Sequence, residues 1–150
     1  MPTVRAAAPA DLEPLVAFNA AMALETEGKR LDLARLRAGV TAALDDAQRG
    51  RYLVAELDGG VAGALLLTRE WSDWRNGWFC WIQSVYVTPE ARRAGVYRAL
   101  HGEALRLAAT EGAVGVRLYV DRENRGAQRT YERLGMQPSH YVFYETEPRG

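Results

Sequence analysis

Three extended segments follow one another in the middle of the chain, with no room for a helix between them. They cover residues 51–57, 61–69 and 78–87, and each is rich in the apolar side chains that are typical of strands. Asp58-Gly59-Gly60 suits a tight turn between the first two, and residues 70–77 read as a polar loop that carries tryptophans. Because strands joined by hairpins pair antiparallel, this meander predicts an antiparallel centre for the sheet.

Helical patterns flank the meander. Pro9 and Asp11 favour the start of a helix that runs to about Leu24, and Asp32 is suited to cap a second helix that includes Leu44. After the meander we expect, in order, a helix over about 95–110, a strand over 114–120, a helix opened by Asn124 and closed by Gly135, and a last strand over 137–146.

Together with a short first strand over residues 3–7, these segments give the order β-α-α-β-β-β-α-β-α-β. Such an order predicts an α/β (α+β) fold, with a mixed, mostly antiparallel central sheet flanked by helices. A chain of 150 residues is the usual size of one domain with its own core, so we expect a single domain over residues 1–150.

The composition excludes several classes of protein. The 19 basic and 19 acidic side chains balance, which argues against a protein that binds the nucleic-acid backbone. Cys80 is the only cysteine, and His101 and His140 lack metal-ligand spacing, so we expect neither a disulfide nor a metal site. No apolar segment approaches the roughly 20 residues of a membrane span. The start of the chain lacks a secretory signal, so we expect a cytoplasmic protein with no membrane contact.

Residues 89–100, P-E-A-R-R-A-G-V-Y-R-A-L, lead from the third strand of the meander into a helix. At such a corner the first helical N–H groups have no internal partner, and with the helix dipole they attract an anion, commonly a phosphate. Gly95 would let a ligand approach the backbone, while Arg92 and Arg93 could pair with phosphate oxygens. A helix start with a solvated face explains the same residues equally well.

Two motifs carry a resemblance to a known family. Arg92-Arg93-Ala94-Gly95-Val96-Tyr97 resembles the acyl-CoA pyrophosphate loop of the GNAT superfamily of N-acetyltransferases, [QR]-x-x-G-x-[GA]. Residues 124–136 resemble the family's N-x-x-A-x-x-x-Y-x-x-x-G-[FM] signature, and the order of elements agrees over nearly the whole chain. Tyr97 departs from the pattern, because Gly or Ala is usual there. Its ring could crowd the pyrophosphate or turn into the sheet, or its hydroxyl could bind a phosphate.

The resemblance implies a function and a site. It implies that an acetyl group passes directly from acetyl-CoA to a primary amine, without a metal, and adds the expectation of a homodimer. The residues implied to bind acetyl-CoA are Val85, Tyr86, Val87, Arg92, Arg93, Ala94, Gly95, Val96, Tyr97 and Asn124. Tyr131 corresponds to the tyrosine that protonates the departing CoA thiolate; a core aromatic is the alternative reading.

The general base is not fixed by the motifs. Where many family members carry a glutamate on the central strand, this chain has Trp81, and Gln83 cannot act as a base near neutral pH. We expect Glu70 or Glu27, or the neighbouring Glu25, to order a water or take the proton. Solvated surface acids, with bulk water as the base, are the alternative.

Four tryptophans lie within eleven residues, at positions 71, 74, 78 and 81. They could form the wall of an acceptor pocket for an aromatic or cationic amine. Packing within a hairpin or at a dimer face would explain them as well.

Rival functions stay open. A non-catalytic sensor or interaction domain that binds acyl-CoA fits the missing strand glutamate and Tyr97, whereas Tyr131 argues for catalysis. Transfer to an oxygen and a longer acyl donor are further alternatives. The acceptor itself can be a small amine, a lysine side chain or a protein N-terminus.

Overall fold

The computed structural model describes residues 1–149. These residues form two compact units, residues 1–119 and the segment that begins at Val120, and each is described by itself.

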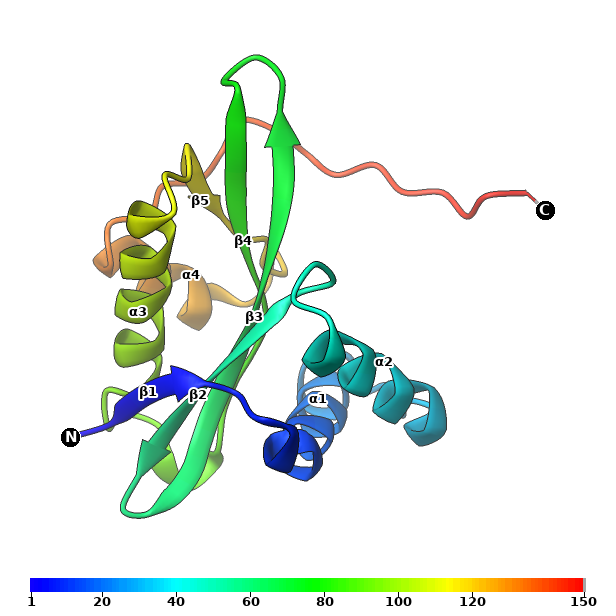
Figure 1. The fold of residues 1–150 in the computed structure, drawn as a ribbon, viewed down its shortest axis with the longest axis vertical. Coiled ribbons are helices and arrows are strands. Elements are labelled where there is room, and N and C mark those ends of the chain that lie inside the picture. Colours follow the sequence, from blue (N-terminus) through cyan, green and yellow to red (C-terminus); the bar gives the residue numbers. More distant parts are fainter. Residues whose placement is uncertain (150) are drawn as a thin grey trace. The chain divides into compact units, whose positions relative to one another are not determined.

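The first unit is built on a mixed sheet of five strands in the order β1-β2-β3-β4-β5 (Figure 1). The first four strands are antiparallel neighbours, and β5 pairs parallel to β4. The predicted meander and the mixed, mostly antiparallel sheet are therefore confirmed. The strands are β1 (Thr3–Ala6), β2 (Arg51–Leu57), β3 (Gly60–Ser72), β4 (Gly77–Val87) and β5 (Gly115–Arg117).

Helices cover both faces of this sheet (Figure 1). Helix α3 (Val96–Thr110) packs on one face, where Leu65, Ile82 and Leu100 belong to one buried cluster. Helices α1 (Leu12–Glu27) and α2 (Leu33–Asp45) pack on the other face, in a second cluster. The side chain of Asp32 caps α2 as predicted, accepting hydrogen bonds from the N–H groups of Ala34 at 3.0 Å and Arg35 at 3.2 Å.

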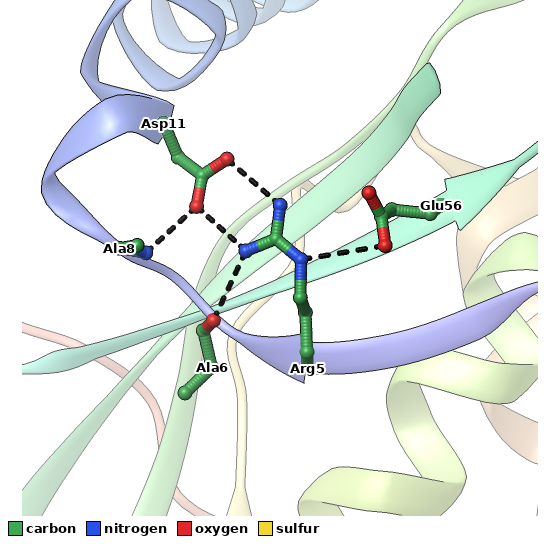
Figure 2. A network of polar contacts seen from close by, with 5 residues as sticks. All are labelled: Arg5, Ala6, Ala8, Asp11 and Glu56. Atoms are coloured by element: carbon green, nitrogen blue, oxygen red, sulfur yellow. Dashed lines mark hydrogen bonds and ion pairs between the residues drawn. The ribbon is translucent and has the colours of Figure 1, made fainter. Parts of the chain in front are cut away.

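The entry into α1 is fixed by a buried carboxylate (Figure 2). Pro9–Asp11 forms a 3₁₀ turn ahead of the helix, and the Asp11 carboxylate is only 5% exposed. Two guanidinium N–H groups of Arg5 donate to it at 2.8 and 3.0 Å, and the Ala8 N–H donates at 2.7 Å. The paired Arg5 is the main cause of the lowered pKa of Asp11. This network therefore links β1 to the start of α1, on the face of the sheet that α1 and α2 cover.

The hairpin between β3 and β4 is longer than the sequence predicts. Only residues 73–76 form the turn, so the expected loop over 70–77 is wrong. Trp71 and Trp78 lie opposite each other in the ladder, with ring centroids 5.0 Å apart and the rings nearly perpendicular. Cross-strand aromatic pairs of this kind stabilise a ladder, which explains why the strands continue through a polar segment.

The end of the chain also differs from the prediction. Residues 137–146 form no strand, and the strand predicted over 114–120 is limited to β5. The run Tyr141-Val142-Phe143-Tyr144 has strand-forming side chains, but strand propensity depends on a partner ladder, and residues 1–149 provide none there. Within residues 120–149, the second unit therefore contains one regular element, helix α4 (Arg125–Arg133).

Within the described part of the chain, no helix combines the length and the apolar character that are needed to cross a bilayer.

Candidate active site

The two halves of β4 are paired differently. Phe79, Cys80 and Trp81 pair with β5 on one side, while β3 runs along the other side. Beyond Trp81, no strand within residues 1–149 pairs with β4 on the side where β5 ends. Apart from the Val87 carbonyl, which accepts a hydrogen bond from Nε of Arg92 at 3.1 Å, backbone N–H and C=O groups on that side of the second half are therefore available to a ligand, since backbone polar groups need partners. Val85, Tyr86 and Val87, which the sequence assigns to acetyl-CoA, all lie in this second half.

A β-bulge marks the change between the two halves. Leu66 pairs with Gln83 and Ala64 with Tyr86, so Ser84 and Val85 together oppose Leu65 alone. Ser84 has a φ of +52°, in the left-handed region that costs a non-glycine residue about 1–2 kcal/mol. Bulges bend a strand and change the direction of its polar groups, and such strain is often found at functional sites.

The corner that follows β4 has an open backbone. Arg92 and Arg93 are the central residues of a type II turn, closed by the Ala94 N–H, which donates to the Ala91 carbonyl at 3.3 Å. Gly95 has a φ of +81°, and a Cβ placed on it would meet no atom within 4 Å. No side chain caps α3, and its first turn has no acidic residue. The first N–H groups of α3 therefore have no side-chain cap, and no carboxylate in the first turn competes for an anion there.

Tyr97 lies in the first turn of α3 but packs away from the corner. Its ring contacts the buried cluster under α3, and its hydroxyl lies 3.2 Å from Nδ1 of His101. His101 is 2% exposed, its Nε2 has no partner in the described residues, and burial lowers its pKa. Of the three orientations considered for Tyr97, the structure has the one in which the ring turns inward.

Tyr86 belongs to a network that joins β4, α1 and the corner. Its hydroxyl donates to one carboxylate oxygen of Glu25, and the Arg92 guanidinium donates to the other at 2.7 Å. Nε of Arg92 also donates to the Val87 carbonyl at 3.1 Å. The Tyr86 hydrogen bond first, and then Arg92, lower the pKa of Glu25. A carboxylate with a lowered pKa is a weaker base, which disfavours Glu25 as the proton acceptor near neutral pH.

Glu70 lies beside Trp81 on the sheet face that carries α1 and α2. The indole N–H of Trp81 donates to Oε1 of Glu70 at 2.8 Å, and Arg117 donates to the same oxygen at 3.0 Å. Gln83, two residues further along β4, donates to the hydroxyl of Thr68 at 2.7 Å. Although the sequence has Trp81 at the glutamate position, a carboxylate from the neighbouring strand is within hydrogen-bond reach of that indole.

The other acidic candidate and the remaining tryptophans lie elsewhere. Glu27 is the last residue of α1, with a largely exposed side chain and the Lys29 ammonium 4.0 Å away. Trp71 and Trp78 pack on each other in the hairpin, and Trp74 is 92% exposed at its turn. Trp81 is therefore the one tryptophan of the four beside Glu70.

Cys80 points to the opposite face of the sheet from Trp81. Its thiol is buried in the α3 cluster, and burial raises its pKa. A thiol that keeps its proton is a poor nucleophile, which supports the interpretation of Cys80 as a core residue.

The remaining two predicted residues lie in the second unit. The Asn124 side chain caps α4 by accepting a hydrogen bond from the Ala127 N–H at 3.1 Å. Tyr131 lies on the same helix, is half-buried, and has its pKa raised by burial. A phenol with a raised pKa keeps its proton at neutral pH, as a general acid must.

Comparison with protein families decides the relationship. The family model described as "Acetyltransferase (GNAT) family" matches residues 18–136, a span that includes both motifs and parts of both units. The chain belongs to the GNAT acetyltransferase family. A search of curated proteins returned no match.

Solved structures of similar fold agree with this family. A possible acetyltransferase from Clostridium difficile 630 is 43% identical to this GNAT chain, with a TM-score of 0.92 over 100% of this chain and 99% of that one. A transcriptional regulator from Bacillus halodurans C-125 is 26% identical, with a TM-score of 0.83 over 98% and 100%. AAC(6')-Iy in complex with a CoA bisubstrate analog shares the fold at 16% identity, with a TM-score of 0.78 over 99% of both chains.

The features of this GNAT chain fit a CoA thioester. The open corner at Gly95, the uncapped start of α3 and the free edge of β4 could together hold a phosphate group and an extended amide-containing arm. Within residues 1–149, no group of three or more metal-ligating side chains is present.

Sequence reasoning missed three features of this site. The bulge at Ser84 is set by pairing register, which a serine does not signal. The Glu25–Arg92 pair joins residues 67 positions apart, which only the folded chain brings together. The third feature is Arg98, which is exposed in the first turn of α3. Its place shortly after Arg92 and Arg93 could have marked it in the sequence as a third cation near the positive end of the helix.

Proposed function

We propose that this GNAT chain is an N-acetyltransferase that transfers an acetyl group directly from acetyl-CoA to a primary amine in the cytoplasm. The observation that carries the proposal is the free edge of β4 beyond Trp81, which leads to the open, uncapped corner at Gly95. A strand edge offers hydrogen bonds to an extended chain, and a helix N-terminus attracts a phosphate, so the two suit the two parts of CoA.

The second half of β4 would bind and polarise the donor. Backbone groups of Val85 and Val87 would bond the pantetheine arm, and a strand N–H would donate to the thioester oxygen as negative charge develops there. Removing one such donor commonly costs about 3–4 kcal/mol of transition-state stabilisation. Asn124 would add a contact to the arm, and backbone N–H groups of the corner from Arg92 to Tyr97, not the Arg92 guanidinium, which Glu25 and the Val87 carbonyl bind, would hold the pyrophosphate.

The amine would attack the thioester carbon, forming the C–N bond as the C–S bond breaks. Glu70 is the favoured acceptor of the amine proton, directly or through a water, because its carboxylate is hydrogen-bonded to the indole of Trp81, the residue at the family's glutamate position. Tyr131 would donate its proton to the departing thiolate. The two proton transfers leave an acetylated amine and free CoA.

Donor binding is the first test. We expect calorimetry to show acetyl-CoA binding by the wild-type protein and its loss in Gly95→Trp, because an indole at the corner would fill the space for the phosphates. Gly102→Trp is the control: Gly102 lies within α3, the helix that Gly95 precedes, and a Cβ there also meets nothing within 4 Å. Binding that survives in Gly95→Trp would contradict the proposed corner.

The second test measures the rate of acetyl transfer, with tryptamine, spermidine and a lysine-containing peptide as acceptors. We expect Tyr131→Phe to lower kcat about 10²–10⁴-fold and Glu70→Gln about 10²-fold, the range of general acid–base catalysis. Loss of the acidic limb of the pH–rate profile in Glu70→Gln would identify the base. An unchanged profile would exclude Glu70, and Glu27→Gln would then be tested in the same way.

The alternative is a non-catalytic domain that binds acyl-CoA, favoured by Trp81 at the usual glutamate position. Such a domain would bind acetyl-CoA in the first test but release no CoA with any acceptor in the second. Sedimentation of the same protein tests the expected homodimer, and a single cooperative unfolding transition would support one domain over residues 1–150.

A further inference from the structure

The side chain of Arg92 is held on the side of the corner that faces α1. Its Nε donates to the Val87 carbonyl at 3.1 Å, and its Nη2 donates to Glu25 at 2.7 Å. Its guanidinium carbon also lies 5.6 Å from the centroid of the Tyr86 ring. All three contacts are with β4 or α1, so the guanidinium is engaged before any phosphate arrives.

These contacts form a closed network across three parts of the fold. Glu25 comes from α1, Tyr86 from the second half of β4, and Arg92 from the turn that begins the corner. The Tyr86 hydroxyl donates to the oxygen of Glu25 that Arg92 leaves free, and the Phe18 ring lies 5.5 Å from the Tyr86 ring. The last turns of α1 are thus fastened to β4 directly beside the bulge.

The end of α1 lies next to the acceptor surface, by which we mean the side chains of Gln83, Trp81 and Glu70 on the face of the sheet that carries α1 and α2. Tyr86 pairs with Ala64 and Gln83 pairs with Leu66, and because Ala64 and Leu66 are two residues apart they face the same side of the sheet. Gln83 and Trp81 therefore continue, along β4, the face on which α1 covers Tyr86. Through its contact with Tyr86, the end of α1 therefore borders the row of side chains formed by Tyr86, Gln83 and Trp81.

Two other arginines at the corner are not engaged. Arg93 and Arg98 are exposed, and neither side chain has a hydrogen-bond or ion-pair partner in residues 1–149. Both lie close to the positive end of α3, where cations are unfavourable unless an anion is present. They are the free positive charges that a diphosphate would meet.

We propose that Arg92 is a positioning residue of the acceptor side: it holds Glu25, and so the end of α1, against β4, while Arg93 and Arg98 supply the charge that binds the donor phosphates. This inference rests on the proposed function. It assigns different partners to Arg92 and Arg98, which stand six residues apart, and it predicts that substitutions at the two positions have different effects.

The experiment compares Arg92→Gln with the matched variant Arg98→Gln. Acetyl-CoA affinity is measured by calorimetry, and hydrogen exchange is followed over residues 20–27 of α1. We expect Arg98→Gln to weaken acetyl-CoA about tenfold, the size of a lost charge-assisted contact, without changing exchange in α1. Arg92→Gln should keep the affinity within about twofold, because the side chain that it removes binds Glu25 and the Val87 carbonyl and the backbone of the corner is retained, and it should speed exchange in α1.

Steady-state kinetics with the amine distinguish a positioning role of Arg92 from a purely structural one. With whichever of the three acceptors turns over fastest, Arg92→Gln should raise the KM for the amine while kcat changes little. Glu25→Gln should have the same effect, and the double variant should be no worse than either, because both remove one shared contact. Arg92→Lys should restore part of the KM, since an ammonium can pair with Glu25 but not also with the Val87 carbonyl.

The outcomes separate this inference from the function beneath it. Wild-type protein that binds no acetyl-CoA would overturn both. Wild-type binding together with an Arg92→Gln variant that loses affinity as Arg98→Gln does would overturn the inference alone. Unchanged exchange in α1, or additive effects of Arg92→Gln and Glu25→Gln, would also overturn it and leave the acetyltransferase in place.

Discussion

The two halves of β4 are paired differently, and the proposed function gives them different tasks. The first half pairs with β3 and β5 together, and its Phe79 and Cys80 are buried. The second half pairs with β3 only, contains the bulge at Ser84 and ends at the open corner. One strand can thus serve the fold and the ligand, because hydrogen bonds that its second half does not make within the sheet remain available to acetyl-CoA.

The largest change in stability should follow from a substitution on the side of β4 that packs into the core. Ile82 directly follows the residues that pair with β5 and is 2% exposed in the cluster under α3, and Ile82→Ala should lower the free energy of unfolding by about 2–5 kcal/mol through lost burial and a cavity. Urea titration measures this change. Trp74→Ala, at the exposed hairpin turn, is the control and should stay within about 0.5 kcal/mol of wild type.

The same variant should still bind acetyl-CoA at a temperature at which it is folded. An Ile82→Ala protein that is folded by circular dichroism but does not bind would show that the buried side of β4 and its donor-binding edge are not separable.

The next largest loss of stability is expected from Ser84→Val, which disfavours the backbone conformation of the bulge. A β-branched residue at a φ of +52° should cost about 1–2 kcal/mol and favour a regular ladder without the bulge. We expect weaker acetyl-CoA binding by calorimetry along with the lower stability. If stability falls while affinity is unchanged, the bulge does not direct the donor-binding groups of β4.

The buried His101 beneath the corner should make stability depend on pH. Its pKa is lower in the folded protein than in the unfolded chain, so the unfolded chain binds more protons below about pH 6.5. Its contribution is therefore fully present above that pH and is lost as the pH falls, by at most about 1.4 kcal/mol per pH unit.

Urea titrations between pH 7.5 and 5 would reveal this slope. His101→Leu should flatten it, whereas His140→Leu, at the other histidine, should retain it. Equal slopes in all three proteins would assign the pH dependence to other groups.

The smallest effect is expected from Ser84→Gly. Glycine adopts a positive φ without strain, so this variant should be as stable as wild type or more stable by up to about 1 kcal/mol, with acetyl-CoA affinity kept. A clear loss of affinity would mean that the Ser84 side chain, and not only the backbone bend, takes part in binding.

Local signals predicted much of this molecule. The apolar runs on either side of Asp58-Gly59-Gly60 predicted the meander, and Asp32 and Asn124 predicted two helix caps that the structure has. The motif at Arg92–Tyr97 and the signature at residues 124–136 indicated the family, which the match over residues 18–136 confirms. These features depend on residues close together in the chain.

Features that depend on distant partners could not be predicted in the same way. The extension of the hairpin depends on the Trp71–Trp78 pair, and the absence of a strand over 137–146 depends on a missing ladder. The sequence named Glu25 and Arg92 for separate tasks, and only the fold shows that they form an ion pair. The catalytic assignments of Tyr131, Glu70 and Glu27 stay predictions.

The most direct test of the account is amide hydrogen exchange along β4 and the start of α3, with and without acetyl-CoA. We predict that acetyl-CoA slows exchange at Val85, Val87 and residues 95–98, and leaves residues 78–81 unchanged, because those already pair within the sheet. Protection that is absent from the second half of β4, or equal in both halves, would contradict the claim that this half of the strand is the donor site.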